Sequence, residues 1–527
     1  MSNIIPLPAE QTLLPGEFQL TPETIIITDL VTIMYSDYLR DLLAIPTGFP
    51  LHGKIGNQSV ASKSIRLRLD PRLDSLGEDG YRLEVRPEAV TITSILPTGI
   101  FYGIQTLRQL LPAAIEERSL VHGVEWRIPC QIINDRPRFG WRGFMLDEGR
   151  HFQGKQAVLQ TLDLMALQKL NVFHWHLTED QGWRIEIKKY PRLTEIGSKR
   201  IGTSRGFIGK HDGIPHGGFY TQEEIRQVVA YAAERNITVI PEIELPGHCM
   251  AALAAYPELS CTGGPFEVAT GFGIFPDIYC PGKEATFTFL QDVLDEMLML
   301  FPAHYVHIGG DEAPKKRWQK CPDCQRRIRE EGLEDEHALQ VWFTNRIATW
   351  LAGRGRRILG WNEILGESLR DDAIIQYWAG SKEILAEAVR SRGQQVVMSD
   401  FLDAYLDHSY SLTPLSRAYR FDPSLPGVDP ANPILLGLEF PLWGEWLPNR
   451  RRMEYQAWPR LTAMAETAWT PRDKKDYPDF LRRLESFLER LDRLGVGYAP
   501  LRDVEPPKIK QLFGIFTIPQ PQTKTSK

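Results

Sequence analysis

From Trp141 onward, short apolar runs alternate with longer stretches in which apolar residues recur at helical spacing. Eight such runs are present, and each ends in polar or glycine-rich residues. They cover residues 142–146, 171–176, 238–243, 305–308, 357–360, 373–377, 395–398 and 434–438. Helical spacing is clear at about residues 155–169, 222–235, 287–300, 337–352 and 453–468. Eight strands in one run, most with a helix after them, predict a TIM (β/α)8 barrel, which is an α/β fold.

The sequence on either side of this repeating pattern is of a different kind. Within residues 1–135, apolar and polar residues alternate at 65–69, 81–85 and 90–92, and apolar residues recur at helical spacing over 99–111. We therefore expect an N-terminal α+β accessory domain at 1–135 and the barrel at 136–470. The remainder, 471–527, is expected to form a C-terminal helical extension docked on the barrel and a tail that is disordered from residue 519.

The charge of the chain limits the kinds of partner that it can bind. The 527 residues carry a net charge of −6, and no cluster of Lys and Arg stands out. This gives no support for binding to nucleic acid or to an anionic membrane. No stretch reaches the ~18 apolar residues of a membrane span, and residues 1–10 lack the basic and apolar regions of an export signal. We therefore expect a cytoplasmic protein, a monomer or homodimer, that acts on a neutral molecule.

The fourth apolar run leads into two adjacent carboxylates. Val306, His307 and Ile308 are followed by two glycines, then by Asp311 and Glu312. Two neighbouring carboxylates in a water-poor site cannot both ionise freely, so the pKa of one tends to rise and that group becomes a proton donor near neutral pH. The glycine pair is expected to leave room for a ligand. This arrangement is typical of glycosidases.

Polar and aromatic residues gather after the carboxyl ends of the predicted strands. Because the active sites of such barrels form at that end, their one-sided placement predicts a functional site there. The residues are Asp147, Glu148, Arg150, Glu179, Asp180, Glu242, Glu244, His248, Asp311, Glu312, Trp361, Glu363, Trp378, Tyr405, Asp407, Trp443 and Glu445.

Aromatic residues beside carboxylates indicate the kind of ligand. Four tryptophans at or near strand ends (Trp175, Trp361, Trp378 and Trp443), together with Tyr405, are expected to supply flat apolar walls. The C–H faces of a pyranose stack on such walls, while its hydroxyls hydrogen-bond to charged groups in the same site. The sequence therefore predicts a sugar ligand.

A metal site is the alternative that the histidines raise. His174 and His176 lie on one face of a strand, and His248 and His307 lie on other strands. However, no histidine stands at the ends of the fifth, sixth and eighth strands. We therefore expect no metal and no cofactor, with His174 and His176 as buried, hydrogen-bonded residues.

The cysteines give no clear sign of a metal site. Cys321 and Cys324 form a single CxxC, with no second Cys or His pair to complete a zinc site. Cys261 and Cys280 flank a glycine-rich loop and could form a disulfide in an oxidising compartment. Because no export signal is visible, we expect free thiols, and the disulfide stays open as an alternative.

Six ordered motifs stand at or near the ends of the predicted strands. They are Asp147-Glu-Gly-Arg150-His, His174-Trp-His-Leu-Thr-Glu-Asp-Gln-Gly-Trp183, Pro241-Glu-Ile-Glu-Leu-Pro-Gly-His248, His307-Ile-Gly-Gly-Asp-Glu312, Gly360-Trp-Asn-Glu363 and Trp443-Gly-Glu445. Together they resemble the β-N-acetylhexosaminidases of glycoside hydrolase family 20. The resemblance is dense over the barrel, extends to the predicted accessory helix at 99–111 and is weakest after Pro471.

The resemblance implies a retaining hydrolase in which the 2-acetamido oxygen of the substrate attacks the anomeric carbon and forms an oxazolinium ion. It assigns Glu312 as the general acid and then the general base, and Asp311 as the group that orients the acetamide. Tyr405 holds the acetamide carbonyl. The aromatic residues that enclose the acetamide are Trp361, Trp378 and Trp443.

The resemblance also implies exo action on a terminal sugar. Arg150, Asp407 and Glu445 bind the outer hydroxyls of the non-reducing sugar and so close the pocket. His248 pairs with an acid at the end of the second strand and supports Glu312. Relatives often carry Asp in that position, whereas this chain has Glu179 followed by Asp180.

Several alternatives stay open at this point. An inactive sugar-binding barrel would keep the aromatic walls but lose one of the paired carboxylates, and a metal-dependent barrel hydrolase would be inactivated by chelators. An endo-acting enzyme would need an open groove. N-acetylglucosamine, N-acetylgalactosamine or both are possible sugars. The insertions at about 190–220 and 256–283 would form either a subunit contact or a wall of the pocket.

Overall fold

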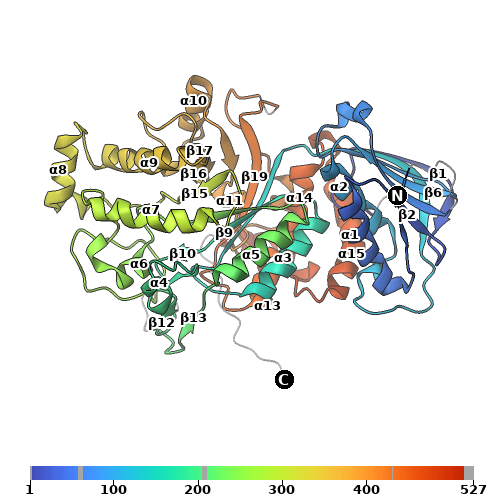
Figure 1. The fold of residues 1–527 in the computed structure, drawn as a ribbon, viewed down its shortest axis with the longest axis horizontal. Helices are drawn as coiled ribbons and strands as arrows, with labels where there is room; N and C mark the ends of the chain where they lie inside the picture. Colours follow the sequence, from blue (N-terminus) through green and yellow to red (C-terminus); the bar gives the residue numbers. More distant parts are fainter. Residues whose placement is uncertain (1–2, 57–62, 205–210, 430, 515–527) are drawn as a thin grey trace.

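The computed structural model describes residues 3–56, 63–204, 211–429 and 431–514. Eight parallel strands of the described chain close into a barrel, so the predicted TIM barrel is confirmed (Figure 1). In order around the barrel the strands are β14 (Thr238–Glu242), β15 (Tyr305–His307), β16 (Arg357–Trp361), β17 (Ile374–Tyr377), β18 (Val396–Met398), β19 (Leu435–Leu442), β8 (Trp141–Asp147) and β9 (Val172–His176).

Helices cover the outside of the barrel (Figure 1). One strand, β16, is followed only by a short 3-10 turn at Asn362–Ile364 before β17 begins. The helices of the barrel region include α3 (Lys155–Leu167), α5 (Gln222–Ala233), α6 (Met250–Ala255), α7 (Glu284–Leu298), α8 (Pro322–Glu330), α9 (Glu336–Ala352), α10 (Lys382–Arg392), α11 (Phe401–Ala404), α12 (Leu415–Arg420), α13 (Arg450–Ala457) and α14 (Arg460–Trp469).

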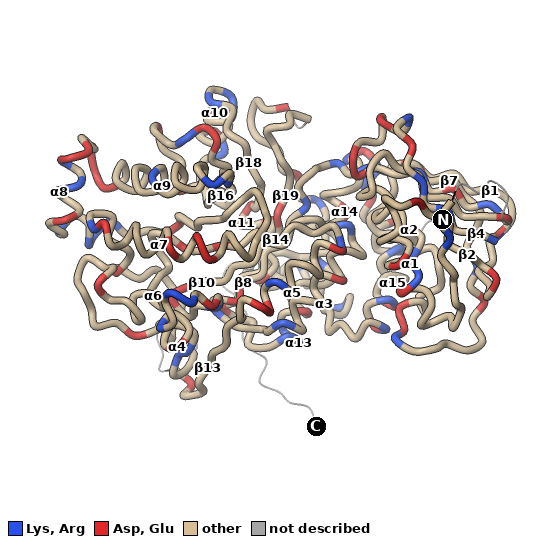
Figure 2. The backbone as a smooth tube through the Cα atoms, in the orientation of Figure 1, with Lys and Arg blue, Asp and Glu red and all other residues tan. Residues whose placement is uncertain are grey.

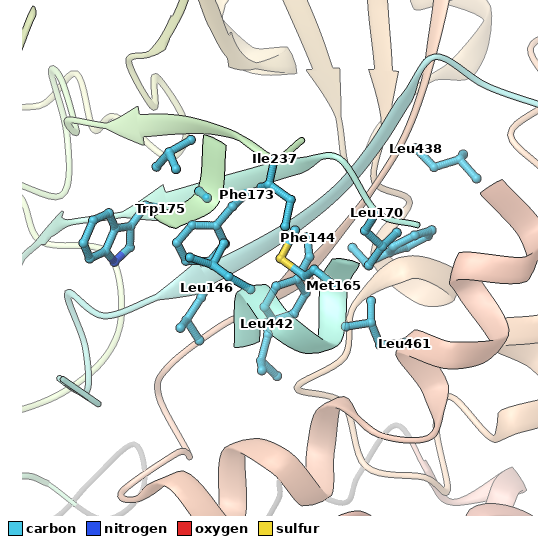
Figure 3. Packing of buried hydrophobic residues seen from close by; sticks show 14 of the residues in the cluster. Phe144, Leu146, Met165, Leu170, Phe173, Trp175, Ile237, Leu438, Leu442 and Leu461 are labelled. Atoms are coloured by element: carbon cyan, nitrogen blue, oxygen red, sulfur yellow. The ribbon is translucent and has the colours of Figure 1, made fainter. Parts of the chain in front are cut away.

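The apolar runs are continuous because both faces of each strand are buried. Every residue of β8 and β9 is buried. Side chains such as Phe144 and Phe173 point outward and pack against Met165 of α3 and other residues of the barrel wall (Figure 3). A smaller apolar cluster fills the interior near the amino ends of the strands, and it contains Trp141, Val172, Ile240, Ala303, Leu359, Ile374 and Val397. Because this cluster fills the barrel interior near the amino ends of the strands, polar groups are left to the carboxyl end.

The predicted single helix at 453–468 is wrong in one respect, because the chain forms two helices there. The first helix, α13, ends at Ala457, and α14 begins at Arg460. Pro459 lies between them, and a proline has no backbone N–H to continue the helical hydrogen bonds. The apolar spacing continues across the break, which is why the pattern alone predicted one helix.

The N-terminal region contains a seven-stranded mixed sheet within the described residues. The sheet order is β1 (Glu10–Gln19), β7 (Arg127–Asp135), β5 (Tyr81–Val85), β6 (Ala89–Ser94), β4 (Ser64–Leu69), β2 (Ile25–Thr28) and β3 (Gly53–Ile55). The sequence pattern predicted β4, β5 and β6, but not the other four strands. Two helices pack on the sheet, α1 (Ile33–Thr47) and α2 (Pro97–Leu110), and α2 is the helix predicted at 99–111. Its Gly103 lies so close to Ile92 that a Cβ atom would stand 2.4 Å from that side chain.

A buried ion pair joins this sheet to the barrel. Asp135, the last residue of β7, accepts hydrogen bonds from Lys169 Nζ at 2.8 Å, from the Tyr81 hydroxyl at 2.6 Å and from Trp469 Nε1 at 3.0 Å. Asp135 and Lys169 are both fully buried. The carboxylate therefore connects the accessory sheet, the turn after α3 and the last residue of α14.

The helix α15 (Tyr477–Arg493) follows the barrel and lies at the same junction, beside α1 and α2 in Figure 1. Its Arg483 forms a buried ion pair with Glu466 of α14 at 2.6 Å, whereas Arg490 bonds Glu116 of the accessory region at 3.0 Å. The helix therefore contacts both parts of the molecule, and not only the barrel as expected. The tail predicted to be disordered, 519–527, lies outside the described residues.

The charged side chains are mixed over the molecule. Figure 2 shows Lys and Arg interspersed with Asp and Glu on the accessory sheet and on the barrel helices. Among the described helices, none is long and apolar enough to cross a membrane.

The contacts of Asp135 predict that this buried carboxylate contributes far more to stability than a carboxylate on the surface of the same sheet. Replacing Asp135→Asn keeps the shape of the side chain but leaves Lys169 buried without a counter-ion. We expect a loss of about 3–5 kcal/mol of stability, measured as a lower midpoint of thermal or urea unfolding.

Glu17→Gln is the matched control, because Glu17 pairs with Arg127 on the exposed side of the same sheet at 3.2 Å. Its expected cost is below about 1 kcal/mol. Equal effects of the two substitutions would contradict the assigned role of Asp135.

Candidate active site

The two adjacent carboxylates lie just beyond β15, in different surroundings. Asp311 is 9% exposed, whereas the Glu312 side chain is 36% exposed. The backbone of Glu312 has a φ of 44°, a conformation uncommon for residues other than glycine. Such conformations persist where the surrounding structure holds them, often at functional sites. The side chains of Asp311 and Glu312, although adjacent in sequence, therefore lie in two different environments.

The glycine pair before them has a different role from the one expected. Gly309 and Gly310 have φ values of 63° and 100°, so both adopt the left-handed region. A Cβ on Gly309 would stand 1.8 Å from Glu244 Oε2, and one on Gly310 would stand 2.2 Å from Ile364. The room that the glycines leave is thus filled by protein side chains and not by a ligand.

His248 bridges the ends of two strands. Its Nδ1 lies 3.2 Å from Glu179 and 3.1 Å from Asp180, and its Nε2 lies 3.6 Å from Asp311 and 3.5 Å from Glu312. Although burial opposes it, the negative charges of Glu179 and Asp311 raise the pKa of His248 well above its usual value. The imidazole is therefore a cation that links the acids after β9 to the carboxylate pair.

Glu179 and Asp180 both contact His248 but differ in their other partners. Glu179 lies in the short strand β10 (Thr178–Glu179) and also pairs with Arg150 Nη2 at 2.7 Å. Asp180 accepts a hydrogen bond from the Met250 backbone N–H at 2.9 Å, at the start of α6. One acid thus connects His248 to Arg150, and the other connects it to a helix.

The Asp311 carboxyl is hard to ionise. Burial, together with the negative charges of Glu363, Glu242 and Glu312, raises the pKa of Asp311 to about 7 against the opposing charge of His248. Its Oδ1 atom is buried and has no hydrogen-bond partner among the described residues. Asp311, which the resemblance does not make the general acid, is therefore the carboxyl whose pKa rises.

Aromatic rings form a continuous wall beside the carboxylates. Trp361 and Trp443 have ring centroids 5.6 Å apart, Tyr405 lies 6.3 Å from Trp443, and Trp378 stacks with Tyr405 at 6.4 Å. Burial raises the pKa of the Tyr405 phenol well above its usual value, so this hydroxyl remains a hydrogen-bond donor. The structure thus gathers four of the five predicted aromatic residues.

Trp175, in contrast, does not belong to this wall. Its side chain points outward from β9 and packs with Phe173 and Leu146 in the core between strands and helices (Figure 3). Its ring lies 4.6 Å from that of Tyr220. The prediction that Trp175 lines the mouth is wrong, because side chains alternate along a strand and its neighbours His174 and His176 point inward.

The three predicted ligands for the outer hydroxyls also lie at this end of the barrel. Arg150 pairs with Asp147 at 3.0 Å and approaches Glu445 at 3.8 Å. Burial and the charge of Glu445 raise the pKa of Asp407 to about 7. Arg150 Nε and Asp407 Oδ1 are buried without a hydrogen-bond partner in the described part of the chain. Buried polar atoms in this state favour a polar ligand.

Beneath the wall lies a buried charge network. His174 bonds Glu439 at 2.7 Å and Glu242 at 2.9 Å, and Trp361 Nε1 donates to Glu242 at 3.0 Å. Although burial opposes it, these two carboxylates raise the pKa of His174 to about 9. His174 is thus a buried residue held between two carboxylates, as expected.

The sequence reasoning gave no role to Glu439 or Glu363. Glu439 is the one charged residue in the apolar run 435–442, and that isolation was the available signal. Glu363 accepts a hydrogen bond from Trp378 Nε1 at 2.9 Å and holds that ring in the wall.

The expectation that Cys321 and Cys324 lack a second pair is also wrong. Cys261 and Cys280, far away in sequence, lie beside them, with sulfur atoms as close as 3.5 Å. Loops that are separate in sequence meet at this point.

The site geometry predicts that Gly309 does not tolerate a side chain. Gly309→Ala would combine a strained φ with overlap of the Glu244 carboxylate, which bonds His176 at 3.1 Å. Gly332→Ala is the matched control, since Gly332 has a φ of 64° but nothing within 4 Å of a Cβ. The control should cost about 1–2 kcal/mol and Gly309→Ala clearly more, measured as midpoints of thermal unfolding. Similar midpoints would contradict the tight packing.

Comparison with known protein families agrees with this geometry. The model described as glycosyl hydrolase family 20, catalytic domain, matches residues 139–472, and that described as glycosyl hydrolase family 20, domain 2, matches residues 1–136. A β-hexosaminidase from Porphyromonas gingivalis is 43% identical over 511 residues. The alignment covers 94% of this chain and 64% of that relative, so the chain spans just under two thirds of its length.

Solved structures show the same fold. The GH20 β-N-acetylhexosaminidase from Streptomyces coelicolor has a TM-score of 0.83 at 34% identity, covering 95% of this chain and 98% of that one. The GH20 exo β-N-acetylglucosaminidase from Vibrio harveyi in complex with N-acetylglucosamine has a TM-score of 0.81 at 34% identity, with 94% and 78% covered. The resemblance in the sequence motifs is confirmed: the chain belongs to glycosyl hydrolase family 20.

Proposed function

We propose that the chain is an exo-acting, retaining β-N-acetylhexosaminidase that removes terminal non-reducing N-acetylglucosamine, N-acetylgalactosamine or both. The observation that carries this proposal is the pairing of a buried and a more exposed carboxylate, Asp311 and Glu312, across His248 and next to the aromatic wall. The relatives named as β-hexosaminidases support the substrate class.

Glu312 acts first as the acid. It protonates the glycosidic oxygen while the acetamido oxygen of the same sugar forms a bond to the anomeric carbon, and the bond to the leaving group breaks. The products of this step are the free leaving group and an oxazolinium ion. Glu312 is then a carboxylate and takes a proton from water. The water oxygen attacks the anomeric carbon and opens the oxazolinium ring, so that the sugar is released with retained β configuration.

Asp311 serves the acetamide. Its buried Oδ1 atom accepts the N–H that becomes positively charged as the oxazolinium ion forms, and its ionised form stabilises that charge. The Tyr405 hydroxyl donates a hydrogen bond to the acetamide oxygen from the other side. The rings of Trp361, Trp378 and Trp443 enclose the methyl group, where exclusion of water strengthens these interactions.

Arg150, Asp407 and Glu445 account for exo action. The guanidinium Nε and the Asp407 Oδ1 atom are the buried, unpaired polar atoms described above, and sugar hydroxyls satisfy both a donor and an acceptor. Such a set closes the site behind one terminal sugar. An endo-acting enzyme needs room there for a further sugar unit.

The function is tested by comparing two aryl glycosides that differ only at C2, the 4-nitrophenyl β-N-acetylglucosaminide and the 4-nitrophenyl β-glucoside. Because the glucoside lacks the attacking acetamide, its kcat/KM should be lower by at least about a thousandfold. Comparable activity on both, or no activity on either, would contradict the proposal.

Glu312→Gln serves as the control for the acid. Its kcat/KM should fall by about 10²–10⁴-fold for a poor leaving group and much less for a dinitrophenyl group, which leaves without protonation. Equal losses for both leaving groups would rule out Glu312 as the proton donor.

The raised pKa of Asp311 predicts a pH dependence. Below its pKa of about 7 the carboxyl is neutral and cannot stabilise the oxazolinium charge, so kcat/KM should fall roughly tenfold per pH unit below that value. Glu363→Gln removes one negative charge that raises this pKa but keeps an acceptor for Trp378. The acidic limb should therefore move to lower pH in the variant, and an unmoved limb would show that Asp311 does not set it.

A further inference from the structure

Four cysteines gather at one edge of the barrel, away from the carboxylate pair. The distances between sulfur atoms are 3.7 Å for Cys261 and Cys324, 3.7 Å for Cys280 and Cys321, and 3.5 Å for Cys280 and Cys324. All four sulfur atoms lie within 4.8 Å of one another. Cys324 lies in α8 and Cys321 directly precedes this helix, which lies at the end of the molecule farthest from the accessory sheet (Figure 1).

These distances match the geometry of a tetrahedral metal site. Zinc binds thiolates at about 2.3 Å, so four sulfurs around one ion stand about 3.8 Å from each other. Ordinary packing of apolar side chains does not require four thiol groups to meet at one point. Four cysteine ligands without an open position are typical of a structural zinc site.

The backbone holds the two pairs in place. Ser260 and Tyr279, the residues next to Cys261 and Cys280, pair as an antiparallel bridge, and the Cys280 N–H donates to Leu259 O at 2.9 Å. Trp318 Nε1 donates to Tyr279 O at 3.0 Å and so connects this bridge to the turn before Cys321. The cluster is therefore pre-formed by hydrogen bonds that do not involve the sulfur atoms.

A glycine shows how closely the two pairs approach. A Cβ on Gly282, two residues after Cys280, would stand 2.3 Å from the Asp323 carbonyl carbon and 2.5 Å from the Cys324 nitrogen. No side chain fits between the two backbones at that point. Cys280 and Cys324 are fully buried, Cys321 is 5% exposed and Cys261 is partly exposed, so three of the four cysteines are shielded from solvent.

We propose that Cys261, Cys280, Cys321 and Cys324 bind one zinc ion as thiolates in a closed structural site. Binding would release the thiol protons and place a doubly negative centre at the start of α8. The helix begins directly after Cys321, and its first N–H groups carry partial positive charge that favours the thiolates. This assignment revises the expectation that the chain binds no metal.

The proposed metal would fix a loop that reaches the active site. Cys261 and Cys280 close the base of the segment 262–279. Near its tip, the Ala269 N–H donates to Asp180 O at 3.1 Å, and Gly271 O accepts from Gln181 Nε2 at 2.8 Å. Phe272 contacts the rings of His151 and Trp446. The same ion would anchor the segment that leads from Glu312 to α8, so it would position two sides of the barrel mouth.

The test is the metal content of the full-length protein, purified without chelator. Elemental analysis should find about one zinc per chain, as a closed four-thiolate site predicts. The thiol reagent p-hydroxymercuribenzoate should release it, detected with a zinc-binding dye. Protein without zinc would overturn the proposal, and so would a mass under non-reducing conditions that shows two disulfides among these cysteines.

A variant pair separates the site from general effects of losing a thiol. The double substitution Cys321→Ser and Cys324→Ser should lose zinc, lower the thermal midpoint and raise KM more than it lowers kcat. Cys130→Ser, at a buried cysteine of the accessory sheet, should keep its zinc. A double variant that retains zinc would overturn the proposal.

If the double variant fails to fold, the zinc content of the wild-type protein still tests the proposed site. Zinc stoichiometry and its release by mercurial need no variant and no substrate. A chain that holds zinc but does not hydrolyse N-acetylhexosaminides would support the zinc site and contradict the proposed function, so the two failures are distinguishable.

Discussion

Carboxylates buried at the carboxyl end of the barrel are compensated by imidazole rings and a guanidinium group, and the positions of the site residues depend on this compensation. His174 joins Glu242 to Glu439 beneath the aromatic wall, and His248 joins the acids after β9 to Asp311 and Glu312. Removing one partner of a buried pair leaves an uncompensated charge, which costs far more than the pair itself contributes. The network therefore constrains every strand that supplies a member.

The same network sets the chemistry. Like charges around Asp311 make its carboxyl hard to ionise, while the nearby imidazolium limits that effect. In the proposed reaction, an acetamide that becomes positively charged in the transition state adds the partner that the free site lacks. The site would then interact more strongly with the transition state than with the ground state, which is the condition for catalysis.

Outside the barrel, two different junctions hold the loops and the accessory sheet. Asp135 and Lys169 attach the sheet to the apolar end of the barrel, where the strands β8 and β9 begin. The proposed zinc site attaches the long segment 262–279 to the chain that follows Glu312. Strands need no such attachment, because their hydrogen-bonded neighbours on both sides already fix them.

The sequence by itself determined the kind of fold and the position of the site within it. The period of the apolar residues predicted eight strands, three accessory strands and several of the longer helices, because side-chain alternation is a local property. The motifs placed Arg150, His248, Asp311 and Glu312 after strand ends, and closure of parallel strands brings such ends to one rim.

Only the tertiary structure decided which of these residues meet. Trp175 faces the helices while His174 and His176 face inward, since the register of β9 and not its composition sets the face. Glu439 became part of the site through pairing with strands far away in sequence. Cys261 and Cys280 met Cys321 and Cys324 because two loops pack backbone to backbone at Gly282. Contacts between distant segments depend on how the whole chain packs, and no local pattern carries that information.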